Sequence, residues 1–377
     1  MRMKHICVVL TLAGMIGLAV IGAETWLETF ENSAGRGALF DVMRTPDDCI
    51  LAVGATNHIH TPTTQGDVLL IKVALDGTLV WERTWGGDAF EQARAVSPAG
   101  EGGAYVFGET ASYGAGNRDF FVLRISAEGE EVWMKTYGSP QREMPFGMLP
   151  LENGDLFIYG ETISGREELY GIRIDSDGEI IWEYQFGDSD DQFITGAVEA
   201  PNGDLALSIA IGQDGGLVRL DSEGNVLWSQ RYESNGQIFP MGALSTEDDG
   251  YLLAGFYQGP RSNGRSDVWL ARCSSEGVLQ WETSFGNLTS NDYAVRLIRL
   301  ADGSALIGGY GSGLPLWCVD NDGNLLWESH PAPPALHATF GLLELAEGGF
   351  IVSGFRTSGR LDNALILRTN EQGQIAE

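Results

Sequence analysis

The sequence predicts an all-β protein, a seven-bladed β-propeller of four-stranded blades whose last blade is closed by the N-terminal strand. Three observations support this fold. A unit of about 50 residues recurs along the chain. Each unit divides into four short segments rich in β-branched and aromatic residues. The repeat region begins with a single fourth segment and ends with a unit that lacks its fourth segment, so the two ends together make one complete unit. We therefore expect residues 1–23 to be a signal peptide and residues 24–377 to form one propeller.

The anchor of the repeat is a glycine that is followed four residues later by a tryptophan. Successive glycines lie 46 to 53 residues apart, and a seventh, Gly373, comes 50 residues after the sixth. A fixed offset in six copies indicates one structural unit used repeatedly. The six copies are Gly77–Trp81, Gly129–Trp133, Gly178–Trp182, Gly224–Trp228, Gly277–Trp281 and Gly323–Trp327.

Within a unit, turn residues separate four strand-like segments. The first segment ends at dipeptides that favour hairpins, such as Asn153-Gly154 and Asn202-Gly203. The second and third are apolar nearly throughout, as in 251–254 and 120–123, and the fourth carries the tryptophan. A strand is apolar on both sides when both of its faces are buried, as between two neighbouring blades. This pattern favours a propeller over a two-sheet sandwich, and a β-solenoid is the main alternative.

The two ends of the chain predict how the ring closes. Residues 26–30 resemble a fourth segment with nothing before it, whereas the seventh unit stops after its third segment. We expect residues 25–30 to pair with the strand containing Ala364–Thr369. This pairing would complete the last blade and set the number of blades at seven.

The N-terminus predicts export. Arg2 and Lys4 form a basic start, an apolar run covers 6–22, and Ala23 suits a cleavage site. An uncleaved anchor helix is the alternative. We expect a secreted or periplasmic protein with no membrane span after cleavage. Lipidation is not expected, because Cys7 lies at the start of the apolar run and not at its end.

The charge balance limits the classes of partner. The chain has 23 basic and 52 acidic residues and a net charge of −29, which makes nucleic acid an unfavourable partner. We expect a monomer whose partner is an extracellular protein or a glycan. After signal cleavage three cysteines remain, Cys49, Cys273 and Cys318, so a fully paired disulfide framework is excluded.

The segment 220–228 has the pattern hydrophobic-Asp-x-x-Gly-x-x-x-Trp, which resembles the tryptophan-docking repeat of quinoprotein-type propellers. The resemblance covers about residues 24–377 and extends to exported bacterial propellers of uncharacterised function. It implies that the tryptophans pack between blades. It implies no particular cofactor, because quinoprotein dehydrogenases of that kind carry adjacent cysteines and this chain has none. The tryptophans concerned are Trp26, Trp81, Trp133, Trp182, Trp228, Trp281 and Trp327.

Two further patterns recur with the repeat. The Asp-rich segments 175–178 and 320–323 faintly resemble calcium loops, but their glycine comes too early, and we interpret them as hairpin turns. A basic residue also stands five positions before most anchor glycines. We expect each cation to lie opposite the tryptophan of its own blade and to form a cation–π contact with it, and a ring of ligand-binding cations is the alternative. These residues are Lys72, Arg124, Arg173, Arg219, Arg272 and Arg368.

No local motif of a known catalytic class stands out, so the leading hypothesis is a non-catalytic binding or scaffold propeller. The alternative is an extracellular enzyme acting on a polysaccharide or a similar substrate, with Glu109 and Glu161 as acid–base candidates. We expect any ligand to bind the face that carries the long, variable loops. The candidate binding residues are Glu109, Glu161, Tyr257, Arg261, Tyr310 and Arg356. His58, His60 and His337 are weak candidates for a transition-metal site, and no metal site is expected, because no carboxylate has ligand spacing.

Overall fold

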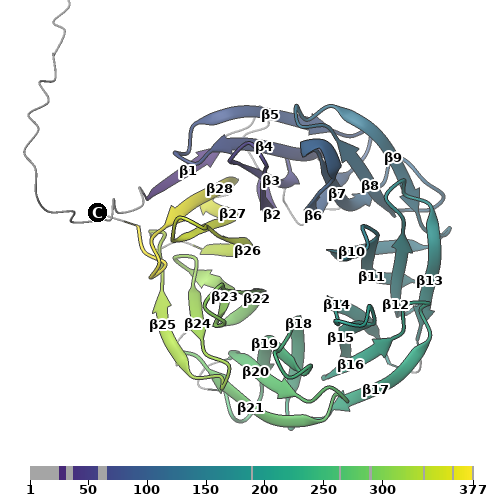
Figure 1. Cartoon of the computed structure of the whole chain (residues 1–377), viewed down its shortest axis with the longest axis vertical. Coiled ribbons are helices and arrows are strands. Elements are labelled where there is room, and N and C mark those ends of the chain that lie inside the picture. Colours follow the sequence, from purple (N-terminus) through teal and green to yellow (C-terminus); the bar gives the residue numbers. More distant parts are fainter. Residues whose placement is uncertain are drawn as a thin grey trace, which may run out of the picture.

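The computed structural model describes residues 25–30, 37–57, 66–187, 190–262, 265–287, 291–333, 336–358 and 361–375. Seven blades surround a central axis (Figure 1), as the sequence predicts. Each blade is an antiparallel sheet with its first strand nearest the axis and its fourth at the rim. No helix among the described residues is long and apolar enough to span a bilayer.

The first four blades follow one another along the chain. Blade 1 contains β2 (Ala38–Arg44), β3 (Cys49–Ala55), β4 (Val68–Ala74) and β5 (Leu79–Trp85). Blade 2 contains β6 (Glu91–Pro98), β7 (Ala104–Thr110), β8 (Asp119–Ile125) and β9 (Glu131–Tyr137), with the 3-10 turn η1 (Gly100–Gly102) after its first strand. Blade 3 contains β10 (Arg142–Pro150), β11 (Leu156–Ile163), β12 (Glu167–Ile174) and β13 (Ile180–Phe186). Blade 4 contains β14 (Gln192–Glu199), β15 (Leu205–Ile211), β16 (Asp214–Leu220) and β17 (Val226–Tyr232).

The remaining strands form three further blades. Blade 5 contains β18 (Gln237–Ser245), β19 (Tyr251–Gln258), β20 (Asp267–Cys273) and β21 (Leu279–Phe285). Blade 6 contains β22 (Tyr293–Arg299), β23 (Ala305–Ser312), β24 (Leu316–Val319) and β25 (Leu325–Ser329). Blade 7 contains β26 (Leu336–Glu344), β27 (Phe350–Ser358), β28 (Leu361–Thr369) and the N-terminal β1 (Trp26–Phe30). Blades 6 and 7 are joined into one sheet, because the end of β23 pairs with the start of β26 at Tyr310↔Ala338.

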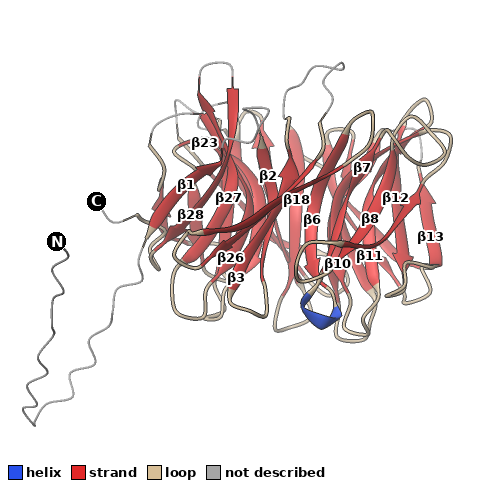
Figure 2. Cartoon of the chain, turned by 90° about the horizontal axis from the view of Figure 1, so that it is seen from above, coloured by secondary structure: helices blue, strands red, loops and turns tan. Residues whose placement is uncertain are grey.

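The core lies between blades. Every residue of β15 is buried, whereas the outer strand β17 is mostly exposed. The middle strands are apolar on both sides because each side packs on a neighbouring blade. The two hairpin turns of each blade lie on one face of the disk, and the longer connections lie on the other (Figure 2). We call these the turn face and the loop face.

The N-terminal strand closes the ring as the sequence predicts. β1 pairs antiparallel with β28 in a register that runs from Trp26↔Arg368 to Phe30↔Ala364. Trp26 Nε1 also donates a hydrogen bond to the carbonyl oxygen of Leu75 in blade 1, at 2.9 Å. The closing strand therefore contacts the blades on both sides of the junction.

The tryptophans dock between blades, each on the anchor glycine of the next blade. A Cβ atom built on Gly178 would lie 2.9 Å from the ring of Trp133, and one on Gly224 would lie 2.9 Å from Trp182. Trp26 takes the same place over Gly77, so the series runs through all seven junctions. The other pairs are Trp81 with Gly129, Trp228 with Gly277, Trp281 with Gly323 and Trp327 with Gly373.

The recurring cations lie opposite the tryptophans in register, as in Arg173↔Trp182 and Arg219↔Trp228. Their contacts differ from the expected cation–π pairs. Arg173 Nε donates to Asp155 in the first turn of its own blade at 2.9 Å, and Nη1 donates to the Ser222 carbonyl in the next blade at 2.9 Å. The cations over Trp81 and Trp133 are instead Arg83 and Lys135. Lys72, Arg219 and Arg368 also donate to the next blade, so these cations serve a structural role between blades. Arg272 donates within its own blade, to Thr246 and Asp248.

The Asp-rich segments are hairpin turns. Asp175 Oδ1 accepts hydrogen bonds from the backbone N–H groups of Asp177 and Glu179, at 2.9 and 2.8 Å. Gly178 has φ of +78°, a conformation that glycine adopts without strain. The same bonds recur at Asp320, so these carboxylates hold the backbone of the turn.

Candidate ligand site in the axial channel

The first strand of every blade contains a β-bulge near its middle. In β6, for example, Ala93 pairs with Gly108 and Ala95 pairs with Phe107, so Arg94 is left without a cross-strand partner. A bulge re-aims the extra side chain out of the regular alternation. The seven bulged residues are Phe40, Arg94, Phe146, Thr195, Met241, Val295 and Phe340.

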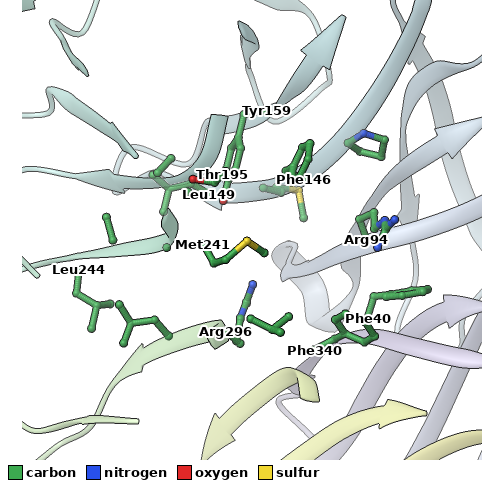
Figure 3. Close-up of a pocket in the computed structure, with 18 of the residues that line it drawn as sticks. Phe40, Arg94, Phe146, Leu149, Tyr159, Thr195, Met241, Leu244, Arg296 and Phe340 are labelled. Carbon is green, nitrogen blue, oxygen red and sulfur yellow. The ribbon is translucent and has the colours of Figure 1, made fainter. Parts of the chain in front are cut away.

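All seven bulged residues line one cavity of about 380 Å³ on the axis of the ring (Figure 3). Its wall is mostly apolar and aromatic. The only charged side chains among the described lining residues are Arg94 and Arg296. A concave, largely apolar cavity with a few polar groups is the usual form of a small-molecule site, and its size falls within the range of such sites.

An ion pair between blades 1 and 6 lies beside this cavity. The residue after the bulge is small in five blades, Ala95, Gly147, Gly196, Gly242 and Gly341, and is Asp41 or Arg296 in the other two. Arg296 Nη2 donates to Asp41 Oδ1 at 3.0 Å, and the backbone N–H of Val96 donates to Asp41 Oδ2 at 3.0 Å. The small residues leave room for these two long side chains to meet near the axis.

Burial disfavours the charged forms of the titratable groups around this ion pair. Burial raises the pKa of Asp41 from its ordinary value, while Arg296 and backbone N–H groups counteract that rise. Burial also raises the pKa of the Tyr159 hydroxyl to about 12. Tyr159 occupies the space beside Gly147, where a Cβ would lie 2.3 Å from the hydroxyl oxygen. Burial therefore favours the uncharged forms of both groups, and for Asp41 the neighbouring Arg296 opposes this.

Aromatic side chains extend around the axis from this cavity. Ring centroids lie 5.3 Å apart for Phe146–Phe193, 5.0 Å for Phe193–Phe239 and 5.1 Å for Phe239–Phe256. The series continues through Phe256–Tyr293 at 4.9 Å and Tyr293–Tyr310 at 6.2 Å. On the other side of the axis, Phe40 lies 4.9 Å from Phe340, which lies 5.9 Å from Phe355.

We call these nine residues the aromatic collar. Most of them are only half-buried, although aromatic rings in a closed core would be covered. Phe193, Phe239 and Tyr293 each precede the bulge by two residues. Because the first strands run from the loop face to the turn face, these rings lie toward the loop face. The collar members are Phe40, Phe146, Phe193, Phe239, Phe256, Tyr293, Tyr310, Phe340 and Phe355.

The candidate binding residues fall mostly in strands instead of loops. Glu109, Glu161 and Tyr257 lie in β7, β11 and β19 and are 3%, 3% and 0% exposed. The expectation that they lie on exposed loops is wrong, because the second strands extend further than the turn signals indicate. Tyr310 is a collar residue in β23, and Arg356 lies in β27. Arg261 does lie in a loop, where it stacks over Tyr257 at 4.7 Å and pairs with Glu282 at 2.7 Å.

The two acid–base candidates occupy equivalent positions in blades 2 and 3, yet their environments differ. Arg118 Nη1 donates to Glu109 Oε2 at 2.9 Å. Burial raises the pKa of Glu161 to about 8, and the nearby Glu167 and Asp191 add to the rise, while Arg142 opposes it. Glu161 is thus protonated over much of the neutral range, and Glu109 is held in an ion pair.

The three histidines considered as metal ligands have no described side chains. His58 and His60 lie outside the described residues, and only the backbone of His337 is described, in β26. No group of three or more potential metal-ligating side chains occurs among the residues that the structure describes. The thiols of Cys49, Cys273 and Cys318 are free.

Comparison with known proteins agrees with this architecture. A family model described as outer membrane protein assembly factor BamB matches residues 64–290, which is more than half of the chain. The chain belongs to this BamB family. The match confirms the resemblance to quinoprotein-type repeats. It also supports a propeller that serves as a scaffold or a binding protein, without specifying the ligand. No curated protein matches the sequence.

Solved structures similar to this BamB-family chain share its fold at low identity. A structure described as YCF48 bound to D1 peptide has a TM-score of 0.54 and 12% identity, covering 94% of this chain and 99% of that one. BamB from Moraxella catarrhalis has a TM-score of 0.51 and 11% identity, covering 93% and 100%. A protein of unknown function from Dyadobacter fermentans has a TM-score of 0.50 and 13% identity, covering 93% and 99%.

The bulged residues and, apart from Tyr310, the collar residues are the site features that the sequence analysis did not identify. A partial signal exists, since a large residue is followed by glycine at Phe146-Gly147, Met241-Gly242 and Phe340-Gly341. The bulged residue follows the preceding anchor glycine by 17 residues in five units and by 18 in blade 6, so the repeat aligns these positions, but nothing in their residue types marks them as bulges. Only the pairing register places them on one axis.

Proposed function

We propose that this protein is an exported, monomeric, non-catalytic propeller that binds a polypeptide segment at the loop-face end of its axial channel. The observation that carries the proposal is the half-buried aromatic collar. Half-exposed aromatic rings supply large contact area at a small entropic cost, as at other recognition surfaces.

Two comparisons support a polypeptide as the ligand. A propeller of the same fold is described as bound to a D1 peptide, and the family model is described as an assembly factor. A shared fold does not show that two proteins bind the same ligand, so binding at the collar has to be tested directly. Glu109 is held in an ion pair, and no carboxylate is among the described residues that line the axial cavity, which favours binding over acid–base catalysis there.

A peptide-library selection against the mature protein tests the proposal. Wild type should select peptides enriched in apolar and aromatic residues, and the double variant F239A/F256A should bind the selected peptides at least 10-fold more weakly. Phe186→Ala is the matched control, because Phe186 is a 50% exposed aromatic on the outer strand of blade 3. Equal binding by the double variant would reject the collar as the site. Hits on a glycan array in place of peptides would reject the polypeptide ligand.

Export is tested separately by the N-terminal sequence of protein recovered from the medium or the periplasm. We expect a mature start at Glu24, which follows the predicted cleavage after Ala23. A chain that retains residues 1–23 in the cytoplasm would contradict this part of the proposal.

A further inference from the structure

The axial cavity carries positive charge in a strongly acidic protein. The chain has 52 acidic and 23 basic residues. Nevertheless, Arg94 and Arg296 supply all the charge on the described part of the cavity wall. In a low-dielectric cavity, charge attracts a counterion more strongly than it does at the surface.

The two arginines differ in how they are neutralised. Arg296 donates to Asp41 at 3.0 Å and is thereby paired. Among the described residues, no carboxylate forms an ion pair with Arg94. Glu109, the acidic group that acts on the pKa of Arg94, is bonded to Arg118 at 2.9 Å. Arg94 is therefore the uncompensated charge in this cavity.

The guanidinium of Arg94 is held in place with donors to spare. It lies over the ring of Phe40, with 4.6 Å between Cζ and the ring centroid. With its amide oxygen turned toward Arg94, Gln92 accepts from Nε at 2.6 Å and from Nη2 at 3.1 Å. A guanidinium has five N–H donors, so three remain for a ligand. Burial lowers the pKa of Arg94, which shows that desolvation of this cation is not fully offset.

The rest of the wall suits an apolar body. Phe40, Phe146 and Phe340 face the cavity together with Met241 (Figure 3). Aromatic and thioether side chains adapt to flat apolar groups. The volume of about 380 Å³ admits a small molecule and excludes a folded segment.

We propose that the axial cavity binds a small organic carboxylate with an aromatic or aliphatic body, and that Arg94 binds its carboxylate. The carboxylate would use the remaining N–H donors of Arg94 in a charge-assisted, bidentate geometry. This site adjoins the polypeptide surface of the proposed function and shares three rings with it, but it rests on Arg94 and the cavity and does not depend on a polypeptide ligand. Phe40, Phe146 and Phe340 would hold the body of the ligand.

Calorimetry with three matched probes tests the site. 3-Phenylpropionate, 3-phenylpropanol and 3-phenylpropylamine share one body and differ in the charge of the head group. We expect wild type to bind the carboxylate at least 10-fold more tightly than the alcohol, and the amine most weakly. Arg94→Gln should remove this preference while leaving the affinity for the alcohol within about twofold.

Two controls make the outcome decisive. Arg83→Gln removes an exposed arginine on the outer strand of blade 1 and should leave all three affinities unchanged. Arg94→Lys keeps a positive charge and should retain part of the preference, which covers the case in which Arg94→Gln does not fold. The proposal is overturned if wild type does not distinguish the carboxylate from the alcohol. It is also overturned if acetate competes as well as 3-phenylpropionate, because the apolar body would then contribute nothing.

Discussion

At the scale of single residues, the seven blades use one backbone position for different purposes. Glu109 and Glu161 occupy the same place in blades 2 and 3, while Phe256 and Tyr310 occupy it in blades 5 and 6. Glu109 is neutralised by Arg118, whereas no cation among the described residues forms an ion pair with the buried Glu161, whose pKa is raised to about 8. A buried carboxyl of this kind makes stability depend on pH.

We expect Glu161→Gln to stabilise the protein in alkaline solution. The unfolded chain releases the Glu161 proton near its ordinary pKa of 4.5, whereas the native protein retains it to about pH 8. Between these values the native state binds more protons, so wild-type stability falls as pH rises. The advantage of the variant in free energy of unfolding should grow by about 2–3 kcal/mol from pH 5.5 to pH 8. Urea unfolding at both pH values measures it, with the exposed Glu223→Gln as control. A difference that does not change with pH would contradict the raised pKa.

At the scale of elements, the junction between blades depends on a tryptophan and a glycine that face one another. Gly178 and Gly154 both adopt positive φ, at +78° and +91°. A Cβ on Gly178 would lie 2.9 Å from the Trp133 ring, whereas a Cβ on Gly154 would meet nothing within 4 Å. The Tyr137 hydroxyl would lie 2.8 Å from the same Cβ. The two glycines therefore separate the cost of backbone conformation from the cost of displacing the tryptophan and its neighbour Tyr137.

Gly178→Ala should accordingly destabilise the propeller more than Gly154→Ala. We expect Gly154→Ala to cost about 1 kcal/mol, because only the backbone is strained. Gly178→Ala should cost about 2–4 kcal/mol, since the tryptophan has to move as well. Thermal and urea unfolding of both variants give the comparison. Equal costs would show that the tryptophan does not need the glycine surface.

At the scale of the whole molecule, the ring depends on one short strand from the far end of the chain. β1 supplies the fourth strand of blade 7 and places Trp26 over Gly77 of blade 1. Its loss would leave β28 with an open edge and the last junction without its tryptophan. Closure is therefore a long-range contact that stabilises all blades together.

Deletion of residues 25–30 should lower the free energy of unfolding by about 3–6 kcal/mol and broaden the transition. Trp26→Ala should show part of the loss, about 2–3 kcal/mol, because the ladder with β28 remains. Calorimetry and hydrogen exchange at β28 report the two effects. Unchanged unfolding of the deletion variant would mean that the ring does not rely on this strand.

The fold could be predicted in detail because its signals are local and repeated. The spacing of Gly77 and Trp81 recurs in six units, and the orphan segment at Trp26 matches the missing segment after Gly373. The position of Arg173 opposite Trp182 is expected from the repeat, and the register confirms it. The contacts of Arg173 could not be predicted, because its partner Ser222 belongs to the neighbouring blade.

The sequence by itself determined the blade count, the closure by the N-terminal strand and the docking role of the tryptophans, because each depends on a fixed offset within one unit. The tertiary structure alone decided the candidate site. Phe40, Arg94 and Phe340 occupy nearly the same place in the repeat, 13 or 14 residues after the preceding tryptophan, but their offset does not reveal their role. They meet because a bulge in each first strand turns them toward the axis, which only the pairing register shows. Likewise, Asp41 and Arg296 are 255 positions apart and form an ion pair because the ring brings blades 1 and 6 close to the same axis.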